Sequence, residues 1–169
     1  MTFTLEDLTR VIAKQNFCVL ATQGPRGPHV AGVGYFACGL EIYIPTSSKT
    51  VKARNITRNP RVAVHIAVPW RLIRAPPRSI QFRGDAEILP YDDAKANEAL
   101  KRAPLALRLV LRRLAKRSNR ELFGENVWIR VKPTRRIETF MVGVPMTTIL
   151  HDETKAILHF EVPKTGAGG

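Results

Sequence analysis

The alternation of apolar and polar positions along the chain predicts a protein built mainly of short strands. The clearest segment is 61–68 (RVAVHIAV), which alternates over its whole length, as a strand with one buried face does. Further strands are predicted at 17–22, 29–37, 40–45, 79–89 and 127–141, with a closing hairpin of 149–150 and 156–162 that turns at 152–154. The first three strands follow one another too closely for a parallel crossover, so they are predicted to form an antiparallel meander. Gly84 is expected at a bulge or a close backbone approach.

Apolar residues at helical spacing predict a few helices around these strands. Residues 4–14 begin with Thr4 as a cap and carry two acids in the first turn. A short helix is expected within 49–58, before Pro60, and two more at 91–102 and 104–117. We therefore expect a single domain over 1–163 with a helical insertion at about 91–120, and a disordered tail at 164–169.

Composition places the chain among ordinary soluble proteins, with 44% hydrophobic and 24% charged residues. No apolar run approaches the roughly 18 residues that a membrane-spanning helix needs. The start, MTFTLEDLTR, does not resemble a secretory signal, so a cytoplasmic location is expected. Two buried thiols are the favoured interpretation of Cys18 and Cys38, although a disulfide between them stays open.

Charge is the unusual property of this sequence. Lys and Arg number 27 against 14 Asp and Glu, which gives a net charge of +13 and predicts an anionic ligand or partner: a phosphate, a polycarboxylate, nucleic acid or an acidic membrane. Residues 101–120 contain eight basic residues and no acidic one. Within 104–117, Leu107, Leu111 and Leu114 form one stripe, which favours a helix packed on the barrel with a solvated basic face. A lid, a nucleic-acid contact or a membrane contact are alternatives, but this helix has no aromatic residue to stack on bases.

None of the familiar catalytic motifs occurs in the sequence, so no catalytic residue is assigned. There is no GxSxG, HExxH or P-loop, and no GxGxxG after a strand. The four histidines are scattered at spacings that suit no ligand set, so no metal site is expected.

One local pattern suits a phosphate group. Thr46-Ser47-Ser48-Lys49-Thr50 closes a strand and leads into a short helix that carries Lys52 and Arg54. Hydroxyls, free amide N–H groups at a helix start and basic side chains within one turn make an anion site. Taken alone, the pattern is more typical of a capping cluster on a solvated basic helix than of a ligand site.

Three motifs in order resemble the pyridoxamine-phosphate-oxidase-like split-barrel superfamily. They are LAT (20–22) followed by Gly27-Pro28, SSKTVKARNITRNPRVAV (47–64) and FRGDAEIL (82–89), and the resemblance covers roughly 17–90. It implies a mainly β fold, an antiparallel split β-barrel with short flanking helices, into which the helical insertion enters. It also implies a homodimer.

The resemblance implies cofactor-binding positions one by one. The phosphate contacts match Thr46, Thr50 and Lys52, with Lys49 as a further candidate. The flavin ring lies against a strand that matches Ala31, Gly32 and Val33, where glycine lets a planar ring approach. Ser79 matches a position that faces the cofactor from the partner subunit.

The sequence also departs from the oxidase itself. Ala31 stands where that enzyme has arginine, and the chain ends in HFEVPKTGAGG instead of an arginine-rich substrate motif. These departures argue against pyridoxamine phosphate oxidation. The pattern VKARNITRNPRV (51–62) is more similar to the flavin- or deazaflavin-dependent reductases of the superfamily. The expected function is an oxidoreductase that holds FMN, or a deazaflavin whose anionic tail suits the basic surface, and transfers hydride to a small substrate. The alternatives are a non-catalytic flavin- or haem-binding protein and a basic nucleic-acid-associated protein of the same fold.

Overall fold

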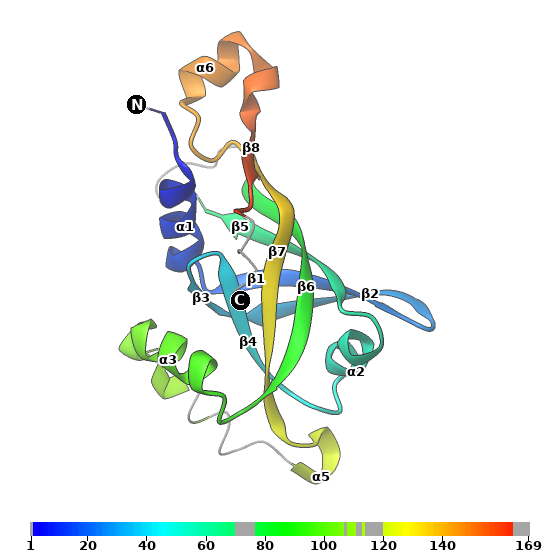
Figure 1. Cartoon of the computed structure of the whole chain (residues 1–169). Coiled ribbons are helices and arrows are strands. Elements are labelled where there is room, and N and C mark those ends of the chain that lie inside the picture. Colours follow the sequence, from blue (N-terminus) through cyan, green and yellow to red (C-terminus); the bar gives the residue numbers. More distant parts are fainter. Residues whose placement is uncertain (1, 70–76, 107, 111–112, 114–119, 164–169) are drawn as a thin grey trace.

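Eight antiparallel strands make up the body of the molecule, as the alternating patterns predict. The computed structural model describes residues 2–69, 77–106, 108–110, 113 and 120–163 (Figure 1). The strands are β1 (Phe17–Gly24), β2 (Gly27–Gly34), β3 (Phe36–Cys38), β4 (Glu41–Ser47), β5 (Arg61–Val68), β6 (Arg78–Pro90), β7 (Asn126–Phe140) and β8 (Ile157–Glu161). In β5 every second residue is buried, because one face of the strand lies on the core and the other faces outward.

The sheet curls into a split barrel because its two end strands are consecutive in the chain. The strand order is β2-β1-β5-β6-β7-β4-β3, with β8 paired to β7. Only Tyr35 separates β2 from β3, so the two ends of the sheet must come together. The fold is therefore mainly β, an antiparallel half-barrel with a few short helices, as expected.

At Tyr35 the structure differs from the sequence prediction of one strand over 29–37 and of a simple meander. Its backbone N–H donates to the carbonyl of Asn16 at 3.0 Å, and its hydroxyl donates to the carbonyl of Ile12 at 2.8 Å. These bonds draw the buried Tyr35 out of the ladder and divide the segment into β2 and β3. The two pieces then belong to opposite ends of the sheet, and β3 forms its hairpin with β4.

Short helices flank the barrel, and most of them lie where the apolar spacing predicts a helix. They are α1 (Leu5–Lys14), α2 (Val51–Arg58), α3 (Ala94–Arg102), α5 (Arg120–Phe123) and α6 (Met146–His151), with a 3-10 turn η1 (Glu153–Ala156). In α1, Thr4 and Asp7 form a capping box, and Leu8 and Ile12 are fully buried in the main core. Among the described helices, none is long and apolar enough to cross a bilayer.

The strands β6 and β7 pair directly with each other, and the segment that connects them leaves the sheet. Within it, α3 packs on the outside of the barrel in a second apolar cluster with Phe36, Tyr43 and Trp128. The Phe36 and Tyr43 rings stack at 5.5 Å, and the Trp128 indole donates to the carbonyl of Tyr91 at 2.9 Å. The helix predicted at 91–102 is thus confirmed, with its start at Ala94.

The helix predicted at 104–117 is described only in part. Residues 105–106, 108–110 and 113 are helical, and the N–H of Arg108 donates to the carbonyl of Pro104 at 3.1 Å. Leu105, Leu109 and Val110 are exposed in this chain. The predicted stripe of Leu107, Leu111 and Leu114 lies outside the described residues, and so does the predicted tail at 164–169.

The predicted closing hairpin is wrong in its first strand. Residues 149–150 belong to α6, a helix that begins after Pro145, while the second predicted strand exists as β8 and pairs with β7. Met141, at a φ of 57°, ends β7, and its N–H donates to the carbonyl of Ala156 at 2.7 Å. The chain therefore makes a helical detour before it returns beside β7.

The bulge expected at Gly84 is confirmed by a register shift between Phe82 and Gly84 in the β6–β7 ladder. A Cβ at Gly84 would lie 2.6 Å from the carbonyl oxygen of Lys132, so only glycine lets the two backbones approach this closely.

Candidate functional site

The end of β4 and the start of α2 form a tight, hydroxyl-lined corner. The Thr50 hydroxyl lies 2.8 Å from the carbonyl of Ser47 and donates its only proton there. It also lies 3.3 Å from the Thr46 hydroxyl, which is then the donor between the two threonines. The Thr46 proton can turn to another acceptor, while that of Thr50 is committed to the backbone.

The first turn of α2 points its N–H groups at this corner without a capping side chain from Thr50. Thr50 is the N-cap residue, and its hydroxyl makes no hydrogen bond to the helix. Uncapped N–H groups carry the positive end of the helix dipole and attract anions.

Lys52 lies in the same turn and is half-buried. It forms no ion pair with any acidic side chain of the described chain, and burial lowers the pKa of its ammonium group. A positive charge that is partly removed from water and lacks a counter-ion is destabilising until an anion joins it.

Lys49, the other candidate for a phosphate contact, points elsewhere. Its ammonium group donates to the carbonyl of Glu121 at 3.1 Å, and its side chain is exposed. Gly124, at a φ of 77°, sits directly on Ser48, where a Cβ would come within 2.3 Å of the Ser48 hydroxyl oxygen. The backbones of Ser48 and Glu125 also bond at 2.8 Å, so the segment after α5 holds the outside of this corner.

The strand that carries Ala31, Gly32 and Val33 is β2, which has an open edge in the described structure. Gly24 and Gly27 flank a two-residue turn and pair with each other. Counting outward from this hydrogen-bonded pair, Val30, Gly32 and Gly34 turn their backbone groups away from β1. The side chain of Ala31 packs toward the core and that of Val33 is buried in it. Of the three residues, Gly32 is the one whose backbone N–H and C=O groups point away from β1.

The open edge of β2 faces β4 across the split in the barrel, and the two strands contact each other. The phosphate corner lies at the far end of β4, beside α2. A planar ring along β2 and a phosphate at Thr46 would therefore occupy one continuous edge.

Ser79 does not join this corner within one chain. Thr46 pairs with Val127, which pairs with Pro90 at the end of β6, whereas Ser79 lies near the start of β6. The chain from Ser79 to Pro90 spans at most about 36 Å at about 3.3 Å per residue. Ser79 is buried in this chain.

Sequence reasoning missed the residues that fix α2 against the first hairpin. Asn55 is buried and donates to the hydroxyl of Thr22 at 3.0 Å. A Cβ at Gly24 would lie 2.5 Å from Oδ1 of the Asn55 side chain, so the hairpin closes directly on this amide. A polar residue on the buried face of an otherwise amphipathic helix was the available signal.

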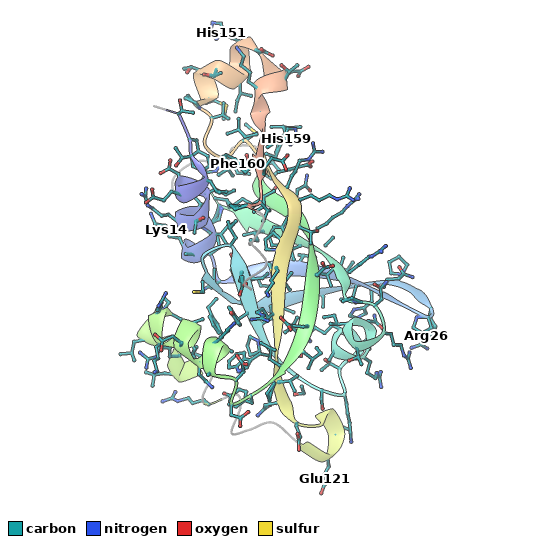
Figure 2. All side chains as sticks on the ribbon, viewed as in Figure 1. Lys14, Arg26, Glu121, His151, His159 and Phe160 are labelled. Atoms are coloured by element: carbon teal, nitrogen blue, oxygen red, sulfur yellow. The ribbon has the colours of Figure 1, made fainter. Side chains whose placement is uncertain are left out.

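The histidines form no metal site among the residues that the structure describes. His65 is exposed on β5, and His159 lies on β8 at 3.7 Å from the carboxylate of Glu138 (Figure 2). Cys18 is buried and Cys38 half-buried, and both are free cysteines.

The strand order and the two end strands that meet around Tyr35 define a small split-barrel β protein. The family model for pyridoxamine 5'-phosphate oxidase matches residues 4–137, and the chain belongs to this family. A comparison with curated proteins gave no match.

Solved structures with the same fold have diverse names. General Stress Protein 26 from Bacillus anthracis str. Sterne is 23% identical with a TM-score of 0.58, and the match covers 81% of this chain and 93% of that one. HutZ, the heme storage protein from Vibrio cholerae, is 15% identical with a TM-score of 0.63, covering 81% and 94%. A FAD-binding protein from Mesorhizobium loti is 19% identical with a TM-score of 0.59, covering 82% and 93%. At these identities the likeness establishes the fold alone; the names of two of these structures state heme storage and FAD binding.

Proposed function

We propose that this protein is a flavin-binding oxidoreductase that holds FMN or a deazaflavin at a homodimer interface. The observation that carries the proposal is the half-buried ammonium group of Lys52, which lacks an acidic partner within the described chain and lies in the first turn of α2. A cofactor phosphate supplies the missing negative charge, and the N–H groups of that turn and the Thr46 hydroxyl complete its contacts.

The open edge of β2 suits the ring of the same cofactor. The Phe17 ring lies over Gly32, where a Cβ would come within 2.8 Å of Phe17 Cζ, so a cofactor ring would approach Gly32 along the open strand edge. There the outward backbone groups of Gly32 can bond to polar atoms at the ring edge. A bound flavin would supply the hydride chemistry, while the chain binds the phosphate, orients the ring and keeps water from one face. Because the flavin would supply the hydride chemistry, no catalytic acid or base is required from the protein.

A homodimer explains why the predicted positions divide into two groups. Thr46, Thr50 and Lys52 lie at one end of the barrel, and Ser79 lies at the other. In a dimer, Ser79 of one subunit can approach the cofactor held by the other.

Charge removal at Lys52 tests the proposal. We expect Lys52→Met to weaken FMN binding about tenfold or more, because a charge-assisted contact is lost. The same change should leave the unliganded protein as stable as before or more stable, because the cost of burying an unpaired charge disappears. Titration of purified protein with FMN and with a deazaflavin, followed by flavin fluorescence, measures the first effect, and urea unfolding measures the second.

Lys49→Met is the matched control, since the Lys49 ammonium group already donates to the carbonyl of Glu121. It should change the affinity less than Lys52→Met does. If neither flavin binds at micromolar concentration, the proposal fails. A hemin titration that gives a stoichiometric haem spectrum instead would assign the protein to the haem-binding alternative.

A further inference from the structure

A second basic site lies on the other side of α2 from the phosphate corner. A cavity of about 340 Å³ separates the turn of the β1–β2 hairpin from the outer face of α2. Its lining residues are Gly24, Pro25, Arg26, Gly27, Pro28 and His29 from the hairpin, and Val51, Arg54, Asn55 and Arg58 from the helix. Thr46, Thr50 and Lys52 do not line it, and Arg54, which the sequence pattern grouped with Lys52, lines this cavity instead. The hairpin–helix cavity is therefore distinct from the proposed flavin site.

Three guanidinium groups surround the hairpin–helix cavity. Arg54 and Arg58 are exposed on successive turns of one face of α2, and Arg26 comes from the tip of the hairpin (Figure 2). Within the described part of the chain none of the three has an ion pair or a hydrogen bond through its side chain, and no acidic residue lines the cavity. Like charges at i and i+4 repel each other, and a bound anion removes that repulsion.

The cavity is held in a fixed shape by buried contacts. The hydrogen bond from Asn55 to Thr22 ties the helix to β1 at 3.0 Å, and the bare Cα of Gly24 rests against the same amide. Gly27 turns the hairpin at a φ of 104°. The Nδ1 atom of His29, a lining residue, is buried and has no hydrogen-bond partner among the described residues.

We infer that the hairpin–helix cavity binds a small molecule that bears two or more phosphate or carboxylate groups, one per chain, independently of the flavin. Guanidinium groups bind such oxyanions through paired hydrogen bonds, and three of them from two elements suit more than one anionic group. The volume is at the small end of the range for ligand cavities. Apart from His29, no ring that could stack on a nucleobase lines it.

Calorimetric titration of the full chain with inorganic pyrophosphate, and separately with citrate, tests the inference. The test variant is Arg54→Gln/Arg58→Gln. The control variant is Lys14→Gln/Lys155→Gln, which removes two positive charges from exposed positions elsewhere. We expect one pyrophosphate or citrate per chain, about tenfold or more weaker binding in the test variant, and less than about twofold change in the control. Flavin affinity should be the same in both variants.

Each other outcome overturns the inference in a recognisable way. Equal weakening in the two variants would mean that net charge alone attracts the anion. A parallel loss of flavin binding in the test variant would make the cavity part of the flavin site. Tight binding of a 20-base-pair duplex that the test variant abolishes, with no binding of either small anion, would assign the arginines to nucleic acid. Because flavin binding is measured separately, failure here leaves the proposed function intact, and the reverse also holds.

Discussion

Asn55 shows how one buried polar residue can position both basic surfaces of α2. Its amide donates to Thr22 on β1, so the helix that carries Lys52, Arg54 and Arg58 is fixed relative to the first hairpin. A buried hydrogen bond of this kind contributes little net free energy, but removing one partner leaves the other unsatisfied.

We expect Asn55→Ala and Thr22→Val each to lower the free energy of unfolding by about 1–3 kcal/mol, because each leaves a buried group without its partner. The double variant should lose clearly less than the sum of the two, since the same hydrogen bond is removed only once. Urea unfolding of the four proteins gives the coupling energy. Simple additivity would show that the hydrogen bond does not join the two residues energetically.

At the residue scale, the sequence could predict which residues lie close together around α2, but not where each side chain turns. The hydroxyl and lysine pattern of 46–52 is local, so the chain itself places Thr46, Thr50 and Lys52 around one corner. The turning of Lys49 toward Glu121 depends on a segment more than seventy positions away, which no local pattern contains.

Among the elements, α1 begins with a capping box whose contribution to stability depends on pH. Asp7 accepts hydrogen bonds from the backbone N–H of Thr4 at 3.0 Å and from its hydroxyl at 2.8 Å. The backbone bond contributes most to the lowered pKa of the Asp7 carboxyl, followed by the hydroxyl bond; Arg10 adds a smaller contribution. The charged form is therefore favoured in the folded state.

We expect the stabilising contribution of Asp7 to be complete above its ordinary pKa of 3.8 and to disappear as the pH falls through the lower folded value. The difference in unfolding free energy between the natural chain and Asp7→Asn should be constant from about pH 5 to 8 and shrink below about pH 4. Urea unfolding across this range measures it. Glu6→Gln, at an exposed neighbouring position, is the control, and a difference that grows on acidification would contradict the assignment.

Most elements could be predicted because their signals are local: caps, breakers and alternation mark α1, β5 and β6. Two errors have long-range causes. The division of β2 from β3 depends on bonds from Tyr35 to Asn16 and Ile12, and the detour through α6 depends on Met141 pairing with Ala156. For α6, Pro145 before a short apolar stretch was a usable helix-start signal.

At the scale of the whole molecule, the outer face of β2, β1 and β5 is the surface that a second copy could cover. Val30, Ala21 and Ala63 lie opposite one another across the three strands, with Gly32, Val19 and His65 in the adjacent row. Val30 and Phe17 are more than half exposed, at 62% and 54%. Small and apolar residues on a sheet face that also carries Gly32 would let a partner approach the proposed ring site closely.

We expect Ala63→Glu to convert a dimer into a monomer, because it places an unpaired charge at the centre of this face. Light scattering after size exclusion measures the mass. Ala94→Glu is the control, since Ala94 is equally exposed but lies on α3, in the first turn, where an acid is tolerated. If Ser79 of the partner subunit contacts the cofactor as proposed, flavin affinity should fall together with the dimer in Ala63→Glu. A monomeric variant that keeps full flavin affinity would show that one chain holds the cofactor alone, and a variant that stays dimeric would move the interface to another face.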